Sequence, residues 1–423
     1  MKQRRIPKSS RGEETRQTLV ESAAQLFLNE GYHKTSVLGI ARRAKTSPAA
    51  FYQYFRSKDE VFGEILQVFQ EESYAKVKAV LLSGEDLPEM LQRLIDVFFD
   101  TIWEQRSAFK SFREAEFIDL SLASSFHRNL CDVLGKTLAF SPDTHKPLVT
   151  LWFLMGPLFF TATYWIQWKG LPVPQQVRQT LHLFFLRGIS PVPFYPDRTC
   201  FSIHQGVEGN ETASGSRGEK TKEKLMRSAE SLFGKKGYNE TSINEIATLS
   251  GVSVGTFYTY FHTKKELLRT LVEQTSRSLR HFLHAYTCAF SDRRNQELAA
   301  YVAFLVYFSQ HAAMYAIVRE AEFIDPQIAR NYYKELQDSY HVVLQTAMDR
   351  GQIRPLTVPD LSLILMGIGH WMGHSLLILS NTTSEGLPAF VEKMAPLLFH
   401  GLEGQPSEEL VRKTEQHKGG KKR

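Results

Sequence analysis

The chain repeats itself at a shift of 206 residues, and this repeat limits the possible folds more than any other feature. Residues 10–66 and 216–272 are identical at 23 of 57 aligned positions. The heptapeptide REAEFID occurs at 113–119 and, at the same shift, again at 319–325. A repeat of this length is a whole domain rather than one turn of a solenoid. We therefore expect two tandem units that share one fold.

The repeat continues more weakly beyond REAEFID. LMG at 154–156 matches 365–367 at a shift of 211, and RGI at 187–189 resembles HGL at 400–402 at a shift of 213. Between the two units, residues 190–215 are rich in Pro, Gly, Ser and Thr and lack helical periodicity. This composition predicts a flexible linker.

The composition of the chain suits folded domains with an anionic partner, because 43% of its residues are hydrophobic and its formal net charge is +6. Basic residues concentrate at both ends, in MKQRRIPKSSRGEETR and HKGGKKR. Cys131, Cys200 and Cys288 are odd in number and far apart, which argues against a disulfide scaffold and a CxxC metal site. The first residues lack the apolar core of a signal peptide. These features predict a protein of the reducing cytoplasm.

Two uncharged stretches, 147–168 and 361–384, are long enough to span a bilayer. A single span between the units would put two similar halves on opposite sides of a membrane. Pro157 interrupts the first stretch, and Gly367 and His370 are among the residues that dilute the second. We therefore expect both stretches to be helices buried against protein.

Both units are predicted to be helical throughout. Val20, Ala23 and Phe27 recur on one helix face, and Met226 and Ala229 do so in the second unit. The later segments also lack strand alternation, and no βαβ pattern occurs in the sequence. The predicted fold class is all-α.

After the first helix of each unit, the sequence predicts two short helices joined by a tight turn. Thr35 and Ser36 cap the second helix, and Ser242 and Glu245 form a full capping box in the second unit. A turn of three residues, KTS or GVS, leads into the third helix, where Pro48 suits the first position. This arrangement is a helix-turn-helix, whose second helix can enter the major groove of DNA.

The first unit departs from the second at two of these positions. Lys45 occupies the turn position where the second unit has Gly251, and glycine is best suited to a positive φ. Gly39 replaces the capping Glu245, at a cost to the helix of about 1 kcal/mol. These differences leave open the alternative that copy 2 binds DNA and copy 1 does not.

These segments resemble the DNA-binding domain of the TetR/AcrR family of transcriptional regulators. The shared signature is T-x-x-x-L-x-x-S-A, then L-F, G-Y, T-S and I-A, then F-Y-x-Y-F-x-[ST]-K-x-E, and it occurs twice. The resemblance implies a three-helix DNA-binding domain at 10–70 and at 216–276. It further implies helical effector-binding and dimerisation domains at 71–189 and 277–403. Residues 404–423 are expected to form a disordered basic tail.

The aromatic blocks FYQYF and FYTYF are expected to have two roles, packing into the core and contacting DNA. Phe51 and Phe55, four residues apart, share a helix face and should pack into the core. Tyr52 and Tyr54 carry hydroxyls that can reach phosphates, and Lys58 begins a helix whose free N–H groups also attract phosphate. The resemblance implies the same roles in the second unit. The expected DNA-binding residues are Thr35, Ser36, Thr46, Ser47, Pro48, Ala49, Ala50, Tyr52, Gln53, Tyr54, Lys58, Thr241, Ser242, Val252, Ser253, Val254, Gly255, Thr256, Tyr258, Thr259, Tyr260 and Lys264.

The resemblance also implies an effector pocket in the second part of each unit. Within REAEFID, Arg113 can pair with Glu116 one turn on, so that the motif suits either helix packing or a pocket. His370 and His374 lie one turn apart but lack a third ligand, so we expect neither a metal nor another cofactor. The expected pocket residues are Trp103, Phe112, Phe117, Trp152, Trp165, Tyr307, Phe323 and Trp371.

The predicted function is transcriptional regulation, as a repressor released by a small hydrophobic effector. An enzyme is not expected, because HExxH and GxSxG motifs are absent and SRGEKT lacks the Gly-Lys of a phosphate loop. The expected partners are a double-stranded DNA operator and the effector. The two units should pair within one chain as a pseudo-dimer on an imperfect palindrome, with a homodimer of two chains as one alternative. The other is a helical sensor or interaction protein in which only copy 2 binds DNA.

Overall fold

The computed structural model describes residues 10–119, 129–130, 133, 146–202, 216–379 and 386–404. Helices make up its regular structure, and no strand occurs among these residues, which confirms the all-α prediction. Cys131, the first nine residues of the basic N-terminal segment, linker residues 203–215 and tail residues 405–423 lie outside the described part.

The described part of the first unit contains four short elements, of four to seven residues, among longer helices. Its helices are α1 (Ser10–Glu30), α2 (Val37–Arg43), α3 (Pro48–Tyr54), α4 (Lys58–Leu81), α5 (Leu87–Glu104), α6 (Arg106–Ala115), α8 (Lys146–Ala162), the π-helix η1 (Thr163–Trp168), α9 (Gln175–Arg187) and the 3₁₀ helix η2 (Arg198–Phe201).

The second unit follows the same order. At the 206-residue shift its long helix α16 aligns with residues 120–143, most of which lie outside the described part. Its helices are α10 (Arg217–Lys236), α11 (Ile243–Leu249), α12 (Val254–Tyr260), α13 (Lys264–Thr287), α14 (Arg293–Gln310), α15 (Ala312–Ile324), α16 (Pro326–Asp349), α17 (Val358–Gly373), the π-helix η3 (His374–Leu379) and α18 (Leu387–His400).

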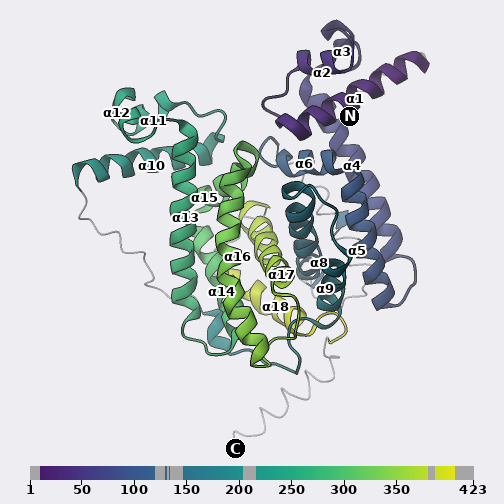
Figure 1. Cartoon of the computed structure of the whole chain (residues 1–423), viewed down its shortest axis with the longest axis vertical. Helices are drawn as coiled ribbons and strands as arrows, with labels where there is room; N and C mark the ends of the chain where they lie inside the picture. Colours follow the sequence, from purple (N-terminus) through teal and green to yellow (C-terminus); the bar gives the residue numbers. More distant parts are fainter. Residues whose placement is uncertain are drawn as a thin grey trace, which may run out of the picture.

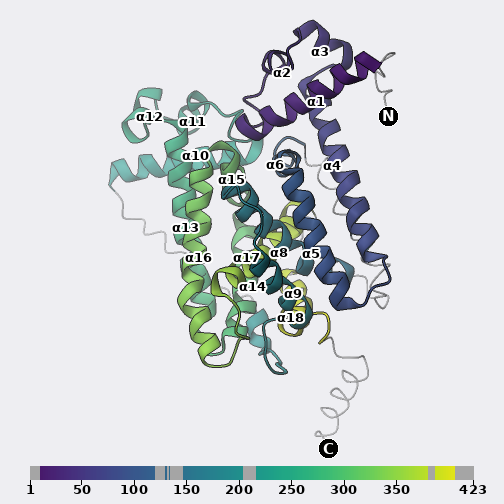
Figure 2. The same cartoon turned by 45° about the vertical axis from the view of Figure 1, so that its right-hand side comes forward.

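The two three-helix domains, α1–α3 and α10–α12, lie at the same end of the molecule, at the top of Figures 1 and 2. The long helices α4 and α13 lead from these domains into the helical body. Between them, α8 and α9 of the first unit pack against α17 and α18 of the second. Apolar residues from both units form one continuous core across this contact.

The backbones of the two units come into close contact where α8 crosses α17. A Cβ atom added to Gly156 would lie 2.7 Å from the carbonyl oxygen of Gly367, and one added to Gly367 would lie 2.6 Å from that of Gly156. Only glycine allows two helix backbones to come this close. The repeated LMG motif therefore marks a crossing point between the units.

The RGI and HGL motifs mark a second reciprocal contact. The Ile189 N–H donates to the Leu398 carbonyl and the Leu402 N–H donates to the Phe185 carbonyl, each at 2.9 Å. Gly188 ends α9 with a φ of 58°, and Gly401 ends α18 with a φ of 64°. These contacts satisfy carbonyl groups that the helix ends would otherwise leave unpaired.

Replacing Gly156 with alanine is expected to destabilise the chain by about 1–3 kcal/mol, because the new methyl group would overlap the α17 backbone. Urea unfolding measures this change. Gly63→Ala in α4 is the matched control, since a Cβ there meets no atom within 4 Å. That variant should gain up to about 1 kcal/mol from helix propensity. Similar effects of both substitutions would contradict the close crossing.

Residues 190–202 differ from the flexible linker that was expected. The Arg294 guanidinium lies 3.8 Å from the centroid of the Phe194 ring and donates to the Ser190 hydroxyl at 2.9 Å. Cys200 is buried within η2. This part of the segment therefore packs on the second unit.

Within the described part of the chain, one helical stretch, Leu148–Trp168, is long and apolar enough to cross a membrane. A bent pair, α14 with α15, passes the same test at an angle of 99°. Of the apolar window in Leu148–Trp168, 89% is buried within the fold. The burial agrees with the expectation that this stretch is a core helix. In the second expected stretch, Leu361, Leu365 and Ile368 are also fully buried.

Candidate nucleic-acid interface and inter-unit site

Side-chain caps build the two helix-turn-helix segments. The Ser36 hydroxyl accepts a hydrogen bond from the Gly39 N–H, and the Ser47 hydroxyl accepts one from Ala50. Ser242 and Glu245 form the predicted capping box in the second unit. These bonds satisfy donors that the helix starts leave free. The predicted second and third helices, α2–α3 and α11–α12, are thus confirmed.

The turn between them adopts a left-handed backbone in both copies. Gly251 has a φ of 69° and Lys45 has a φ of 54°. Among the described residues, Lys45 is the one non-glycine residue with a positive φ. The first copy keeps the turn of the second copy at some cost in backbone strain.

The aromatic blocks divide between core and surface. Phe51 and Phe257 are fully buried, and Phe55 and Phe261 are 1% exposed, which confirms their predicted core role. In contrast, Tyr52 is 50% exposed on the outer side of α3, and Tyr258 on α12 is 49% exposed. The same short helices therefore anchor themselves with phenylalanine and present tyrosine to the solvent.

Most of the expected DNA-binding residues lie on the surface of these domains. Exposed are Ser36, Ser47, Pro48, Ala49, Tyr52, Gln53, Ser242, Ser253, Val254, Gly255, Tyr258 and Thr259. Half-buried are Thr46, Ala50, Tyr54, Val252, Thr256 and Tyr260.

Thr35 and Thr241 require a correction. Their side chains are 3% and 1% exposed, and each hydroxyl donates to the carbonyl of the glycine that ends the first helix of its domain, at 2.8 Å. Both threonines therefore hold the loop after the first helix and have no surface to offer DNA.

Lys58 and Lys264 also have partners inside their domains. The Lys58 ammonium donates to the Tyr32 carbonyl at 2.8 Å and lies 3.9 Å from the centroid of the Tyr32 ring. The Lys264 ammonium donates to the Tyr238 carbonyl at 2.7 Å in the same way. Burial lowers the pKa of both lysines. These contacts brace the loop between the first and second helices, and a phosphate contact by either lysine stays a prediction.

REAEFID connects each DNA-binding domain to the helical body. Both carboxylate oxygens of Glu114 accept from the Tyr32 N–H, at 3.0 and 3.1 Å. Glu320 accepts from the Tyr238 N–H in the same way, at 3.1 Å. The first glutamate of the motif, on α6 or α15, therefore holds the loop of its own helix-turn-helix domain.

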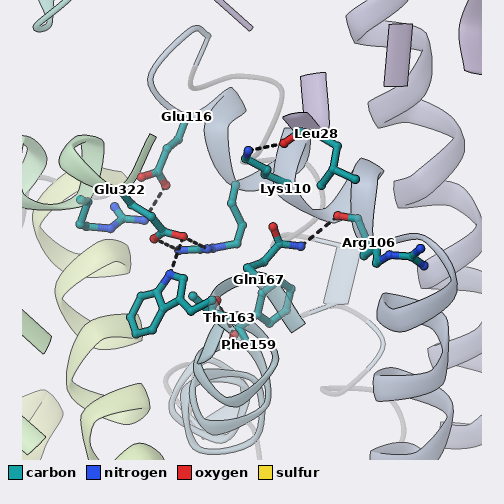
Figure 3. A network of polar contacts seen from close by, with 11 residues as sticks. Leu28, Arg106, Lys110, Glu116, Phe159, Thr163, Gln167 and Glu322 are labelled. Carbon is teal, nitrogen blue, oxygen red and sulfur yellow. Dashed lines mark hydrogen bonds and ion pairs between the residues drawn. The ribbon is translucent and has the colours of Figure 1, made fainter. Parts of the chain in front are cut away.

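The second glutamate of the motif reaches the other unit. Arg113 makes a two-pronged ion pair with Glu322, with both nitrogen–oxygen distances at 2.6 Å. Arg319 donates to Glu116 at 2.6 Å. Figure 3 shows these crossed ion pairs around the labelled acids Glu116 and Glu322. The expectation that Arg113 pairs with Glu116 on its own helix was therefore wrong.

The charged groups of this site stabilise one another. Burial alone would raise the pKa of Glu116, but Arg319 and His374 outweigh it and lower that pKa to about 2. The His374 Nε2 atom lies 2.9 Å from a Glu116 oxygen. Burial lowers the pKa of His370 to about 3, so that this imidazole is neutral at pH 7. The Glu116–Arg319 pair is thus charged at neutral pH.

A cavity of about 90 Å³ lies beside the crossed ion pairs and is lined by both units. Four of the expected pocket residues, Phe112, Phe117, Phe323 and Trp371, line it. The other four, Trp103, Trp152, Trp165 and Tyr307, lie elsewhere in the helical body. The expected histidine pair also lines this cavity, and the described residues contain no group of three side chains suited to a metal. The expected pocket residues did not include the charged side chains that line this cavity, although the unchanged REAEFID motif contains them.

Comparisons with known proteins match the two three-helix domains. The family model of bacterial regulatory proteins, tetR family, matches residues 19–65 and 225–271. The HTH-type transcriptional activator FasR of Mycolicibacterium smegmatis is 28% identical over 114 residues, which are 27% of this chain and 50% of that protein. The HTH-type transcriptional repressor KstR2 of Rhodococcus jostii is 30% identical over 99 residues, or 23% of this chain and 48% of that protein. The chain thus spans half or less of these relatives.

The transcriptional regulator FadR from Bacillus subtilis, in complex with stearoyl-CoA, aligns with 43% of this chain and 98% of its own. The identity is 16% and the TM-score is 0.40.

Proposed function

We propose that this chain is a cytoplasmic DNA-binding transcriptional regulator that acts as a single-chain pseudo-dimer. The chain belongs to the tetR family of bacterial regulatory proteins and carries two family domains in tandem. The observation that carries the proposal is the placement of α3 and α12. Both helices belong to capped helix-turn-helix segments, expose a tyrosine, and lie at one end of the molecule (Figure 1).

The contacts between the units support the pseudo-dimer. The glycine crossing, the exchanged backbone hydrogen bonds and the crossed ion pairs each occur as two related contacts. Such reciprocal contacts are typical of a two-fold dimer interface. Joining the units in one chain raises the effective concentration of each for the other to the millimolar range. Pairing within the chain is then favoured over pairing between chains.

Both copies should bind DNA. Copy 1 exposes Arg42, Arg43 and Lys45 near its turn, where copy 2 has Thr248, Leu249 and Gly251. Cationic side chains at this position suit phosphate contacts. They favour DNA binding by copy 1 over the alternative in which copy 2 alone binds.

The two recognition helices should read different half-sites, because their exposed side chains differ. Gln53 on α3 can make two hydrogen bonds to an adenine, whereas Thr256 on α12 can contact a thymine methyl group. The operator is therefore an imperfect palindrome. We propose repression as the mode of action, with release by a small effector.

Selecting bound fragments from random DNA would identify the operator, and light scattering of the complex would give its stoichiometry. One chain on a short operator supports the pseudo-dimer. Two chains on it would show instead that four DNA-binding domains act together. A lack of any enriched sequence, or affinity that ignores salt, would reject the DNA-binding function.

Gln53→Ala is expected to weaken binding by about 1–3 kcal/mol and to relax base preference in one half-site. Thr259→Ala changes the equivalent position of α12 and should alter the other half-site alone. Repeating the fragment selection with each variant measures both effects. A loss of preference in both half-sites with either variant would contradict the assignment of one helix to each half-site.

A further inference from the structure

The cavity between the units has an asymmetric lining. At the 211-residue shift of the repeat, Phe159 corresponds to His370, Phe160 to Trp371 and Thr163 to His374. Two identical chains would place the same side chain on both sides of a two-fold axis. The fusion of two units removes this constraint, so that a single small molecule can be held in one orientation.

The two crossed ion pairs differ in their hydrogen bonding. Glu322 is fully engaged, because Arg113 reaches both of its oxygens and the Trp168 indole N–H donates to it at 3.0 Å. Arg319 donates to Oε2 of Glu116, and the His374 Nε2 atom lies 2.9 Å from the same oxygen. Its Oε1 atom and Nη1 of Arg319 are buried and have no hydrogen-bond partner among the described residues. One acceptor and one donor are thus left over at the same ion pair.

A buried donor or acceptor without a partner costs about 1–3 kcal/mol. The Glu116 side chain is 8% exposed, which limits what bulk water can supply. Aromatic rings surround the site: Phe159 lies 4.6 Å from Trp371, and Phe160 stacks on His370 at 5.3 Å between ring centroids. The cavity therefore offers aromatic walls, one acceptor beside one donor at the Glu116–Arg319 pair, and Nδ1 of His370, which is also buried without a hydrogen-bond partner among the described residues.

The size of the cavity limits the ligand to about one ring. A single water needs roughly 10–15 Å³ of such volume, so that the cavity of about 90 Å³ has room for roughly six to nine waters. The charges limit the ligand further, because two arginines and two glutamates already balance. An added charge in this site would lack a partner and cost several kcal/mol.

We propose that this cavity binds one neutral, single-ring molecule that carries a hydrogen-bond acceptor beside a donor, such as an aromatic carboxamide. Its carbonyl would accept from Nη1 of Arg319, its N–H would donate to Oε1 of Glu116, and its ring would pack against the aromatic wall that Phe159 and Trp371 form. The role of this cavity as the effector site of the regulator rests on the proposed function.

The position of the cavity suits such a role. Glu114 and Glu320 hold the loops of the two DNA-binding domains. Glu114 lies two residues before Glu116 in the first copy of REAEFID, and Glu320 directly follows Arg319 in the second copy. A ligand that bridges Glu116 and Arg319 would act on both connections. It shifts the DNA-binding equilibrium only if it prefers one arrangement of the domains.

Calorimetric titration of the full chain without DNA tests the site. Benzamide, benzoate and benzamidine have the same ring and nearly the same shape but are neutral, anionic and cationic. Benzamide is expected to bind with a Kd on the order of 0.1–1 mM, and at least tenfold more tightly than either charged probe. Absence of benzamide binding, or tighter binding of benzoate or benzamidine, would overturn the proposal.

Two variants separate binding from folding. Thr163→Leu fills the cavity from one wall and should abolish benzamide binding without lowering the melting temperature. Ser73→Ala, at a separate cavity of about 10 Å³ in the first unit, should bind benzamide as the wild type does. Unchanged benzamide binding by Thr163→Leu would place the ligand elsewhere and reject the assignment.

A gel-shift assay on the selected operator then tests the effector role. Benzamide should weaken the complex of the wild type and leave that of Thr163→Leu unchanged. Benzamide binding without any change in operator affinity would reject the effector role. A protein that binds benzamide but no DNA would instead reject the proposed function.

Discussion

Replacing Arg319 with methionine is expected to lower the free energy of unfolding by about 3–5 kcal/mol, because the Glu116 carboxylate loses its cationic partner inside the protein. The two groups are 2.6 Å apart, and their side chains are 20% and 8% exposed. Methionine keeps most of the apolar length of arginine, so that the loss reports mainly the missing charge. Urea unfolding, followed by tryptophan fluorescence, measures it.

The matched control is an ion pair between the same two units at the surface. Arg187 and Glu403 are 3.5 Å apart, with side chains 58% and 39% exposed. Arg187→Met should cost less than about 1 kcal/mol, because water replaces the partner. Adding Glu116→Gln to Arg319→Met should restore much of the stability, since no buried charge then lacks a partner. Equal losses from Arg187→Met and Arg319→Met would contradict the role of burial.

The sequence could not predict these crossed pairs. Arg113 and Glu116 are three residues apart, which is the spacing of neighbours on a helix. In the structure α6 ends at Ala115, and the partner of each arginine comes from the other unit, more than 200 residues away. Contacts of this kind depend on how two helices approach in space, and spacing along one helix contains no information about that.

Local backbone features were predictable, because they depend on neighbouring residues. The capping box at Ser242 and Glu245 follows from side chains three residues apart. The comparison of Lys45 with Gly251 indicated a positive φ at that turn, and both residues have one. Each feature requires a particular residue type within a few positions, which the sequence displays directly.

The expected pocket residues could be predicted only in part. Trp152 and Trp371 occur in similarly apolar segments, yet Trp152 is fully buried against Phe390 while Trp371 lines the cavity between the units. Core and pocket residues share the same composition. The difference between them is a small gap in packing, which depends on every surrounding side chain.

The stability of the chain should depend on pH through Glu114, with an effect of about 3 kcal/mol. Burial raises the pKa of this carboxyl from 4.5 to about 7, against the opposing influence of Lys110 and Lys58. Each pKa unit corresponds to 1.36 kcal/mol. Between pH 4.5 and 7 the folded chain holds a proton that the unfolded chain has released, so the contribution of Glu114 to stability falls as the pH rises.

The comparison with Glu114→Gln isolates this contribution. Glutamine keeps an oxygen that can accept from the Tyr32 N–H but cannot ionise. The wild type should therefore lose stability relative to the variant as the pH rises from about 4.5 to about 7, and the difference should be constant above that range. His370, whose pKa burial lowers to about 3, acts with the opposite sign, but it is present in both proteins and cancels in the difference. Urea unfolding of both proteins at pH 5, 6, 7 and 8 measures the difference. A difference that does not change with pH would mean that Glu114 binds no more protons in the folded chain than in the unfolded chain over this range, and would contradict the prediction.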